Sequence, residues 1–303
     1  MKFTVETELH RFRGCLLGLA VGDTIGTTVE FKSRGSFPPV MDMLGGGIFG
    51  LKPGQWTDDT SMALCLATSL ISKNGFDPVD QMNRYWDWYK NGYLSSTGRC
   101  FDIGSTVRQA LEKYNRIGDP FSGSTEANTA GNGSLMRLAP IPMFYFPDLE
   151  KTIHFAGESS RTTHGTQECI DACRLFAEML FRALSGSSKD DILFNTTVKI
   201  TAPKINDIAS GDYCQKPITK IQGIGYVVDS LEAALWCFYQ STTFEEAILQ
   251  AANLGDDADT TAAICGQIAG TYYGESNIPL RWLELLYMRV EITNLADQLS
   301  NRR

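Results

Sequence analysis

Three carboxylates and two hydroxyls lie within six residues of the sequence, from Asp256 to Thr261. Asp257, Asp259 and Thr260 directly precede a segment of small apolar residues that is typical of a buried helix. Carboxylates packed this closely repel one another unless positive charge joins them. A helix N-terminus supplies part of that charge, and a hard divalent cation with oxygen ligands, such as Mg²⁺ or Mn²⁺, would supply more. Taken alone, the pattern fits an acidic helix cap as well as it fits a metal site.

A second cluster of the same kind lies far away in the sequence. Thr57, Asp58, Asp59 and Thr60 also precede an apolar segment with helical spacing. If the fold brings the two clusters together, Asp58, Asp59, Asp257 and Asp259, with the hydroxyls of Thr57 and Thr260, would form a site for two divalent cations. This repetition favours the metal site over the cap.

Further candidates for chemistry lie in the loops. Glu30 follows a glycine-containing segment, and Asp102 lies in a Gly/Ser loop before a helix, where it could also be a simple cap. A second loop of small residues opens onto a helix, and free N–H groups at such a junction can bind phosphate. Its members are Gly131, Asn132, Gly133 and Ser134. His164 lies at a helix junction, where either ligand contact or burial is compatible with the sequence.

The elements that must position these residues are predicted to be helices. Gly14, Gly18 and Gly22 recur every four residues in the first helix, a spacing that lets another backbone approach closely, and glycines 22 and 26 are predicted to break this helix. Residues 32–55 and 195–225 are predicted to be loops, the latter with one short helix. Nowhere does a series of alternating strands appear, so we predict an all-α fold, an orthogonal bundle of about a dozen helices. The clearest are expected at residues 8–21, 60–72, 78–91, 165–184 and 226–239.

Composition bounds the class of protein. No linker or shift in composition divides the 303 residues, so we expect residues 1–303 to form a single domain. The net charge is −8 and no stretch is dense in Lys and Arg, which argues against a nucleic-acid-binding face. No signal-peptide pattern or membrane span is evident. The eight cysteines are scattered through apolar patterns, as in a cytoplasmic protein with reduced thiols, and a monomer is expected.

Five segments together resemble the ADP-ribosylglycohydrolases, most closely the bacterial dinitrogenase reductase-activating glycohydrolases. They are Gly22-Asp23 with Glu30, Trp56–Thr60, Gly131–Arg137, Thr163–Gly165 and Leu254–Thr260. The resemblance implies an all-helical domain with two Mg²⁺ or Mn²⁺ ions. It also implies an enzyme that releases ADP-ribose from ADP-ribosylated proteins, with arginine as the modified side chain in the nitrogenase-linked branch.

The same resemblance implies a role for each candidate residue. Glu30 and Asp102 would be the catalytic acids at the metal pair and near the scissile bond, and Tyr226 would border the ligand. Asp256 stands where relatives often have glycine and would cap or support the site, and Ser105 stands where close relatives have asparagine, which bears on substrate preference. The metal ligands would be Thr57, Asp58, Asp59, Asp257, Asp259 and Thr260, and the diphosphate and ribose would be held by Gly131, Asn132, Gly133, Ser134 and His164.

Three alternatives stay open. Residues 257–261 also fit the D-x-D-x-T signature of aspartyl-phosphate phosphatases, but that motif must follow a parallel strand and here a helical pattern precedes it. A relative that binds ADP-ribose without catalysis is a second possibility, although every matched ligand position is intact. A third is hydrolysis of another ADP-ribose conjugate, with serine, a nucleic acid or a small molecule.

Overall fold

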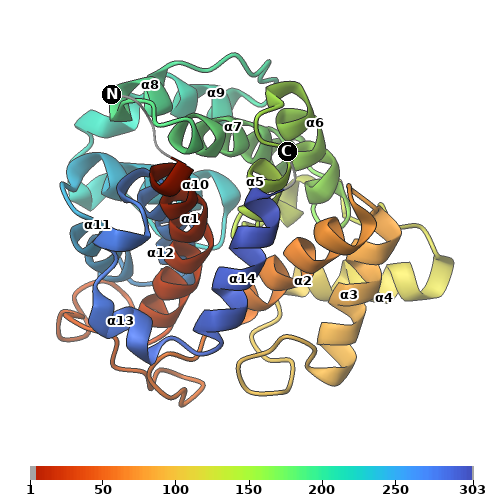
Figure 1. Cartoon of the computed structure of the whole chain (residues 1–303), viewed down its shortest axis with the longest axis horizontal. Helices are drawn as coiled ribbons and strands as arrows, with labels where there is room; N and C mark the ends of the chain where they lie inside the picture. Colours follow the sequence, from red (N-terminus) through yellow and green to blue (C-terminus); the bar gives the residue numbers. More distant parts are fainter. Residues whose placement is uncertain (1–4, 302–303) are drawn as a thin grey trace.

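The computed structural model describes residues 5–301, in which α-helices are joined by loops and 3₁₀ turns (Figure 1). Within these residues, pairing of extended segments is limited to three isolated bridges, so the predicted all-α class is confirmed. The fourteen α-helices are α1 (Val5–Gly26), α2 (Asp58–Lys73), α3 (Pro78–Asn91), α4 (Ser105–Ile117), α5 (Pro140–Tyr145), α6 (Leu149–Arg161), α7 (Gln167–Leu184), α8 (Lys189–Phe194), α9 (Pro203–Ala209), α10 (Val227–Gln240), α11 (Phe244–Ala252), α12 (Ala258–Tyr273), α13 (Leu280–Leu285) and α14 (Arg289–Ser300).

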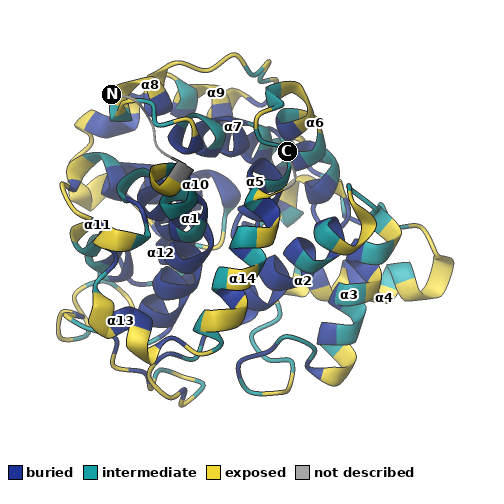
Figure 2. Cartoon of the chain, viewed as in Figure 1, coloured by how far each residue is buried: buried dark blue, intermediate teal, exposed yellow. Residues whose placement is uncertain are grey.

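Helices α1 and α12 lie side by side, and α1 is buried from Gly14 to its end and α12 from its start to Thr271 (Figures 1 and 2). A Cβ atom at Gly18 would lie 2.3 Å from the carbonyl oxygen of Gly266, and one at Gly22 would lie 2.1 Å from that of Ala262. The predicted close approach of another backbone is therefore confirmed, and its partner is α12. The contacts along the two helices pair Gly14 with Gly270, Gly18 with Gly266, Gly22 with Ala262, and Gly26 with Ala258. The reversed order makes the helices antiparallel, so the end of α1 lies beside the start of α12.

The predicted end of the first helix is wrong. The glycines at 22 and 26 were expected to break it, but α1 continues to Gly26. Glycine costs roughly 1 kcal/mol in a helix relative to alanine. Here the same absence of a side chain permits the backbone contact with α12, and the packing gained outweighs the poor helix propensity.

Other predicted helices agree with the structure to within two residues. The prediction for residues 78–91 is confirmed as α3, which Asp77 caps by accepting hydrogen bonds from the N–H groups of Val79 and Asp80. Gly92 ends this helix with a left-handed backbone, φ 73°. The predictions for 165–184 and 226–239 correspond to α7 and α10. The helix expected directly after the small-residue loop 131–134 begins later, with α5.

The segment 195–225 contains α9 and two 3₁₀ turns, and two buried carboxylates of α7 anchor its first part. Glu178 accepts a hydrogen bond from the N–H group of Thr197 at 2.9 Å, and Asp171 accepts one from that of Thr201 at 2.8 Å. These bonds satisfy backbone donors that no regular element would pair. The weak sequence pattern of this segment is thus compensated by tertiary contacts.

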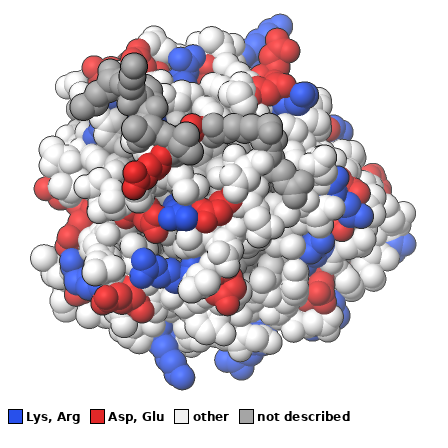
Figure 3. Space-filling view, viewed as in Figure 1, with Lys and Arg blue, Asp and Glu red and all other residues white. Residues whose placement is uncertain are grey.

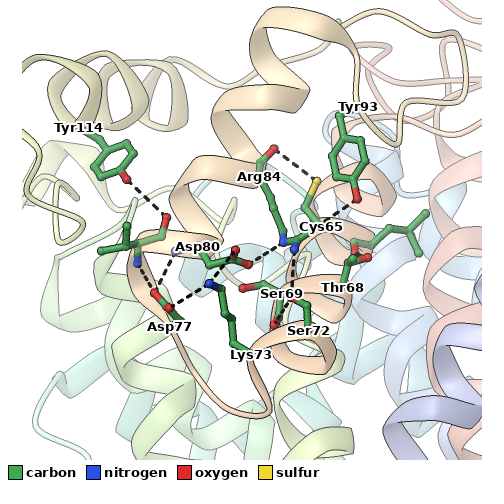
Figure 4. Close-up of polar contacts among 12 residues, drawn as sticks. Cys65, Thr68, Ser69, Ser72, Lys73, Asp77, Asp80, Arg84, Tyr93 and Tyr114 are labelled. Atoms are coloured by element: carbon green, nitrogen blue, oxygen red, sulfur yellow. Dashed lines mark hydrogen bonds and ion pairs between the residues drawn. The ribbon is translucent and has the colours of Figure 1, made fainter.

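Helices α2 and α3 form a hairpin with a polar surface (Figure 4). The guanidinium of Arg84 donates to Asp80 at 2.6 Å and to Ser72 at 3.0 Å, and Lys73 lies 3.7 Å from Asp80. Beneath these contacts Tyr85, with other buried side chains of α2, α3 and α4, forms a second, smaller core. The hairpin therefore holds α2 rigidly at the end remote from its acidic N-terminus.

The surface and the thiols agree with the sequence. All eight cysteines are free, and all but Cys100 are buried, as predicted. On the face seen in Figure 3, Lys and Arg are interspersed with Asp and Glu. No helix within residues 5–301 is long and apolar enough to cross a lipid bilayer.

Candidate active site

The N-terminus of α2 is fixed to the last turn of α1 by Asp23. Its carboxylate accepts hydrogen bonds from the N–H groups of Thr57 at 2.9 Å and Thr60 at 3.0 Å, and from both threonine hydroxyls. The hydroxyl of Thr57 does not cap its own helix, so Asp23 satisfies these N–H groups from a neighbouring helix. The sequence patterns predicted no role for Asp23, because the helix was expected to end before it. Only the full length of α1 shows an acid in its last turn, where the helix dipole disfavours negative charge.

The two acidic motifs meet at the N-termini of α2 and α12. The Thr57 hydroxyl lies 3.3 Å from an oxygen of Asp59 and 3.3 Å from an oxygen of Asp259, and the Thr260 hydroxyl lies 3.3 Å from Asp59. Asp59 and Asp259 are fully buried, and Oδ1 of each lacks a hydrogen-bond partner in the described residues. Unpaired buried carboxylate oxygens are costly, so each points to a missing positive partner.

A second group of acids adjoins this one. One carboxylate oxygen each from Glu30, Asp102 and Asp259 lie within 4.8 Å of one another. Glu30 comes from the turn after α1, and Asp102 comes from the loop before α4. Asp102 is not the cap of α4, since Gly104 holds that position. The capping alternative for Asp102 is therefore excluded, and its carboxyl group instead lies near those of Glu30 and Asp259.

Burial and mutual repulsion raise the pKa values of these acids. Burial, with the charges of Asp102 and Asp257, raises the pKa of Glu30 to about 9. Burial foremost raises the pKa of Asp102 to about 7 and that of Asp23 to about 6. Burial and then neighbouring carboxylates hold three further pKa values well above the ordinary range. These belong to Asp58, Asp59 and Asp259.

The donor set fits hard divalent cations. It consists of carboxylate and hydroxyl oxygens, which Mg²⁺ and Mn²⁺ prefer, and two helix N-termini supply partial positive charge only. Without a cation the cluster must take up protons, as the raised pKa values indicate. Among its oxygens, Oδ1 of Asp59 and Oδ1 of Asp259 are buried and without a hydrogen-bond partner in the described residues. A metal site is thus compatible with the chemistry of these residues.

Residues 131–133 of the small-residue loop form another part of the wall. The Asn132 side chain donates to Asp257 at 2.7 Å and to Ser230 at 3.1 Å, which ties the loop to the start of α12. The Asn132 N–H donates to the carbonyl of Gly225, and the Val227 N–H donates to that of Ala130. The loop is therefore held from both sides, and its position relative to the acids is fixed.

His164 packs directly beneath this loop. A Cβ atom at Gly133 would lie 2.9 Å from Cε1 of its ring, and one at Gly131 would lie 3.4 Å from Nε2. Glycine at position 133 is therefore required by the imidazole ring itself. Burial, with the positive charge of Arg137, lowers the pKa of His164 to about 3, so the ring is neutral at physiological pH.

These walls enclose a cavity of about 530 Å³. Six carboxylates line it, and among its described lining residues none is Lys or Arg. The carboxylates are Glu30, Asp58, Asp102, Asp256, Asp257 and Asp259, and Gly131, Asn132, Gly133, His164 and Thr260 also line it. A cavity of this size accommodates a small-molecule ligand.

Comparison with known proteins identifies the family. Residues 4–303 match the family profile described as ADP-ribosylglycohydrolase. The chain belongs to the ADP-ribosylglycohydrolase family. It is similar to the ADP-ribosylarginine hydrolase Tri1 of Serratia proteamaculans, with 46% identity over 97% of this chain and 80% of that protein. It also resembles the ADP-ribosyl-dinitrogen reductase glycohydrolase of Rhodospirillum rubrum, with 33% identity over 93% of this chain and 92% of that one.

A solved structure supports the same conclusion. It is titled ADP-ribosylglycohydrolase-related protein complex, and it matches with a TM-score of 0.87 and 41% identity over 98% of this chain and 99% of that one. The predicted family, the helical fold and the activity class of a hydrolase are therefore confirmed. The phosphatase alternative is wrong, because the motif at 257–261 follows helix α11 rather than a strand.

Two residues that the resemblance assigned to ligand binding do not line the cavity of this ADP-ribosylglycohydrolase. The Ser134 hydroxyl faces the interior, where it accepts a hydrogen bond from Ser160 at 2.9 Å. The Tyr226 hydroxyl donates to Glu168 at 2.7 Å and accepts from Lys204. The backbone of Tyr226, however, pairs with that of Gly131, which places it behind the loop.

Three cavity residues of this ADP-ribosylglycohydrolase have left-handed backbones although none is glycine. They are Phe31, Asp102 and Asp256, with φ of 61°, 60° and 55°. The Phe31 N–H donates to the carbonyl of Asp256 at 2.7 Å, and the Asp256 N–H donates to that of Lys32 at 2.8 Å. Strained residues cluster where function requires them. Sequence analysis placed Asp256 in a supporting role only and missed Phe31.

Proposed function

We propose that the protein is a hydrolase that removes ADP-ribose from arginine side chains of modified proteins. The observation that carries the proposal is the cavity with six converging carboxylates at the N-termini of α2 and α12. The similarity to the Serratia relative, which is named an ADP-ribosylarginine hydrolase, supports the linkage. The cytoplasmic location and the monomeric state stay predictions from the sequence.

Two divalent cations, Mg²⁺ or Mn²⁺, are proposed as cofactors. Asp58, Asp59, Asp257 and Asp259 would hold them, with the hydroxyls of Thr57 and Thr260. When bound, such cations supply the positive charge that orients the ribose diol and acidifies water. Asp23 and Asn132 would keep the ligands in place through their hydrogen bonds to Thr57 and Asp257.

Proton transfer is assigned to Glu30 and Asp102. Cleavage of an N-glycosidic bond passes through an oxocarbenium-like state, so it requires an acid for the departing group and a base for water. Both carboxyl groups line the cavity, and both have an oxygen near Asp259. We propose that this pair divides the two roles.

The wall formed by residues 131–133 and His164 would hold the ADP-ribose. The glycines at 131 and 133 line the cavity, and backbone N–H groups in such loops bind phosphate oxygens well. The N–H group of Gly131 donates to the carbonyl of Thr129, so that of Gly133 would contact the phosphate. Asn132 and His164 line the same wall and would contact the ribose or the diphosphate. Ser134 and Tyr226 would act indirectly, by holding the loop from behind.

The charge of the cavity favours a cationic leaving group. Two divalent cations would carry four positive charges against the six lining carboxylates, which leaves net negative charge for a guanidinium. Asp256 and Phe31 both line the cavity and are joined by a backbone hydrogen bond, and Phe31 is 62% exposed. A carboxylate and an aromatic ring are both groups to which a guanidinium binds. The side chain of serine is uncharged, so serine-linked ADP-ribose would gain no attraction from the negative charge of the cavity.

The direct test is hydrolysis of arginine-linked and serine-linked ADP-ribosyl peptides, with Mg²⁺ and with EDTA. We expect faster release of ADP-ribose from the arginine peptide and loss of release in EDTA. Preference for serine would contradict the linkage. Stabilisation by ADP-ribose without turnover of either peptide would instead support a non-catalytic binding protein.

Replacement of a proposed metal ligand tests the site. In Asp257→Ala we expect loss of Mg²⁺ binding by calorimetry and loss of hydrolysis, with the helical circular dichroism spectrum retained. Asp212→Ala, at an exposed aspartate remote from the cavity, is the matched control. Activity retained in Asp257→Ala would contradict the assignment.

A further inference from the structure

Arg137 is a fully buried cation that forms no ion pair with a carboxylate in the described residues. Its guanidinium donates to the carbonyl of Gly133 at 2.7 Å and to the hydroxyl of Thr163 at 2.8 Å. It also lies over the ring of Tyr85, 4.7 Å from the centroid. A buried charge is costly, so its retention at this place requires a reason. Its two shortest bonds lead to the two segments that form the ligand wall.

The hydrogen bonds determine where the Thr163 proton goes. Arg137 can only donate, so it occupies a lone pair of the Thr163 oxygen. The hydroxyl proton remains, and Nδ1 of His164 lies 2.8 Å away as its acceptor. If Nδ1 carried a proton, the buried hydroxyl proton of Thr163 would face no acceptor. The chain Arg137 to Thr163 to His164 therefore leaves Nδ1 without a proton and places the ring proton on Nε2.

The Nε2 edge of the ring faces the cavity. His164 lines the cavity, and Nε2 is the ring nitrogen that approaches Gly131. Among the residues from 5 to 301, no hydrogen bond to Nε2 occurs, although Nδ1 is paired. The ring can thus offer one N–H donor to a bound molecule.

We propose that Arg137 and Thr163 are positioning residues that fix His164 as the neutral Nε2–H tautomer, so that the ring presents a hydrogen-bond donor without a charge to an acceptor oxygen in the cavity. That this oxygen belongs to the ribose or diphosphate of ADP-ribose rests on the proposed function. The assignment of the tautomer does not rest on the proposed function.

The surroundings of the ring agree with a neutral donor. Arg137 opposes protonation from one side, and the low pKa of His164 reflects burial and this charge. On the other side of the loop, Asp257 is bound by Asn132, and the thiol of Cys169 donates to the carbonyl of Gly131. Burial raises the pKa of Cys169 to about 12, so the thiol adds no charge.

Nitrogen NMR of the ligand-free protein tests the tautomer directly. The chain has three histidines, so ¹⁵N-histidine labelling gives few signals, and the variant His164→Asn assigns those of position 164. At neutral pH we expect an unprotonated Nδ1 and a protonated Nε2. A proton on Nδ1, or a charged ring, would overturn the proposal.

Matched variants test the positioning residues. In Thr163→Val the donor to Nδ1 is lost, and we expect the two tautomers to mix, whereas Thr163→Ser should retain the wild-type signals. In Arg137→Met the ring should gain its proton at a higher pH than in the wild type. If Arg137→Met fails to fold, the comparison of Thr163→Val with Thr163→Ser tests the proposal. Wild-type signals in Thr163→Val would contradict the proposed chain.

Calorimetry with ADP-ribose and Mg²⁺ tests the purpose of the donor. Loss of one aligned hydrogen bond should weaken binding to Thr163→Val by up to about tenfold, while Thr163→Ser stays near the wild type. Equal affinity of both variants would overturn the role of Nε2–H in binding. Failure of the wild type to bind ADP-ribose would contradict the proposed function, and the tautomer would still be measured.

Discussion

At the scale of single residues, the site depends on side chains that carry an unfavourable feature. Asp23 places a negative charge in the last turn of α1, and Asp256 adopts a left-handed backbone, φ 55°, that glycine would adopt without strain. Both features are offset by contacts with a second segment. The carboxylate of Asp23 accepts hydrogen bonds from the start of α2. The backbone of Asp256 forms hydrogen bonds with the backbone of residues 31 and 32.

Removal of the Asp23 carboxylate should weaken both the fold and the metal site. In Asp23→Ala two N–H groups and two hydroxyls at the start of α2 lose their acceptor, which should lower the free energy of unfolding by about 2 kcal/mol in Mg²⁺ and reduce Mg²⁺ affinity. Thermal denaturation and calorimetry measure the two effects. Asp23→Asn should lose less stability and less Mg²⁺ affinity. If Asp23→Ala were as stable as Asp212→Ala, these bonds would contribute little to stability.

Replacement of Asp256 by glycine should separate stability from specificity. Asp256→Gly relieves a left-handed backbone, so its melting temperature should equal or slightly exceed that of the wild type. Its kcat/KM should fall more for the arginine-linked peptide than for the serine-linked one. Asp256→Asn, which removes only the charge, is the control. Equal losses on both peptides would contradict a contact between Asp256 and the guanidinium.

At the scale of elements, the backbone contact between α1 and α12 determines where the acids lie. Because the glycine stripe allows no side chain between these helices, the end of α1 and the start of α12 keep a fixed spacing. Helix α2 is then attached to α1 through Asp23. Three helix ends are thus brought to one cavity by contacts that lie outside it.

Gly18→Ala tests this arrangement at a distance from the cavity. The new Cβ would lie 2.3 Å from a carbonyl oxygen of α12, so the helices must separate, at an expected cost of about 3 kcal/mol. We also expect weaker Mg²⁺ binding. Gly157→Ala in α6 is the matched control, because its Cβ would meet the movable side chain of Arg174. Similar melting temperatures for the two variants would show that the contact tolerates separation.

At the scale of the whole molecule, folding gathers buried acids in the interior of a chain that is already acidic. We propose that the chain forms one domain, since its first and twelfth helices share a core and its two acidic motifs share a cavity. Repulsion among the buried carboxylates should make the stability of the protein depend on pH and on divalent cations.

Removal of metal should expose this dependence. The pKa values of Glu30, Asp102 and Asp23 are raised to about 9, 7 and 6, so the folded state binds more protons than the unfolded state. In EDTA, stability should therefore be highest near pH 5 and fall as the pH rises toward 9. Each 1 kcal/mol lost lowers the melting temperature by roughly 2 °C in a chain of this size.

Differential scanning fluorimetry across this pH range, with EDTA and with Mg²⁺ or Mn²⁺, measures the effect. The cations should flatten the pH profile and raise the melting temperature most at high pH, where the carboxylates are ionised. A metal-free protein that gains stability between pH 5 and pH 9 would contradict the proposed charge repulsion.

Local features of this protein follow from short stretches of its sequence. Apolar spacing, the Asp77 cap and the Gly92 stop are contained within single helices, so α3 could be predicted to the residue. The glycine spacing in the first helix predicted a close backbone contact, and the paired acidic motifs, with their resemblance to a family, predicted the class of hydrolase. The assignment of each site residue stays a prediction that the experiments above test.

Contacts between residues of different segments depend on how the helices pack. The length of α1 depended on α12, because glycines that weaken an isolated helix also permit the backbone contact that stabilises this one. The partners of Asp23 on α2, the approach of Asp102 to Glu30 and Asp259, and the link from Arg137 through Thr163 to His164 join segments distant in sequence. Local propensity carries no information about such pairs, since their energies exist only once the helices have packed.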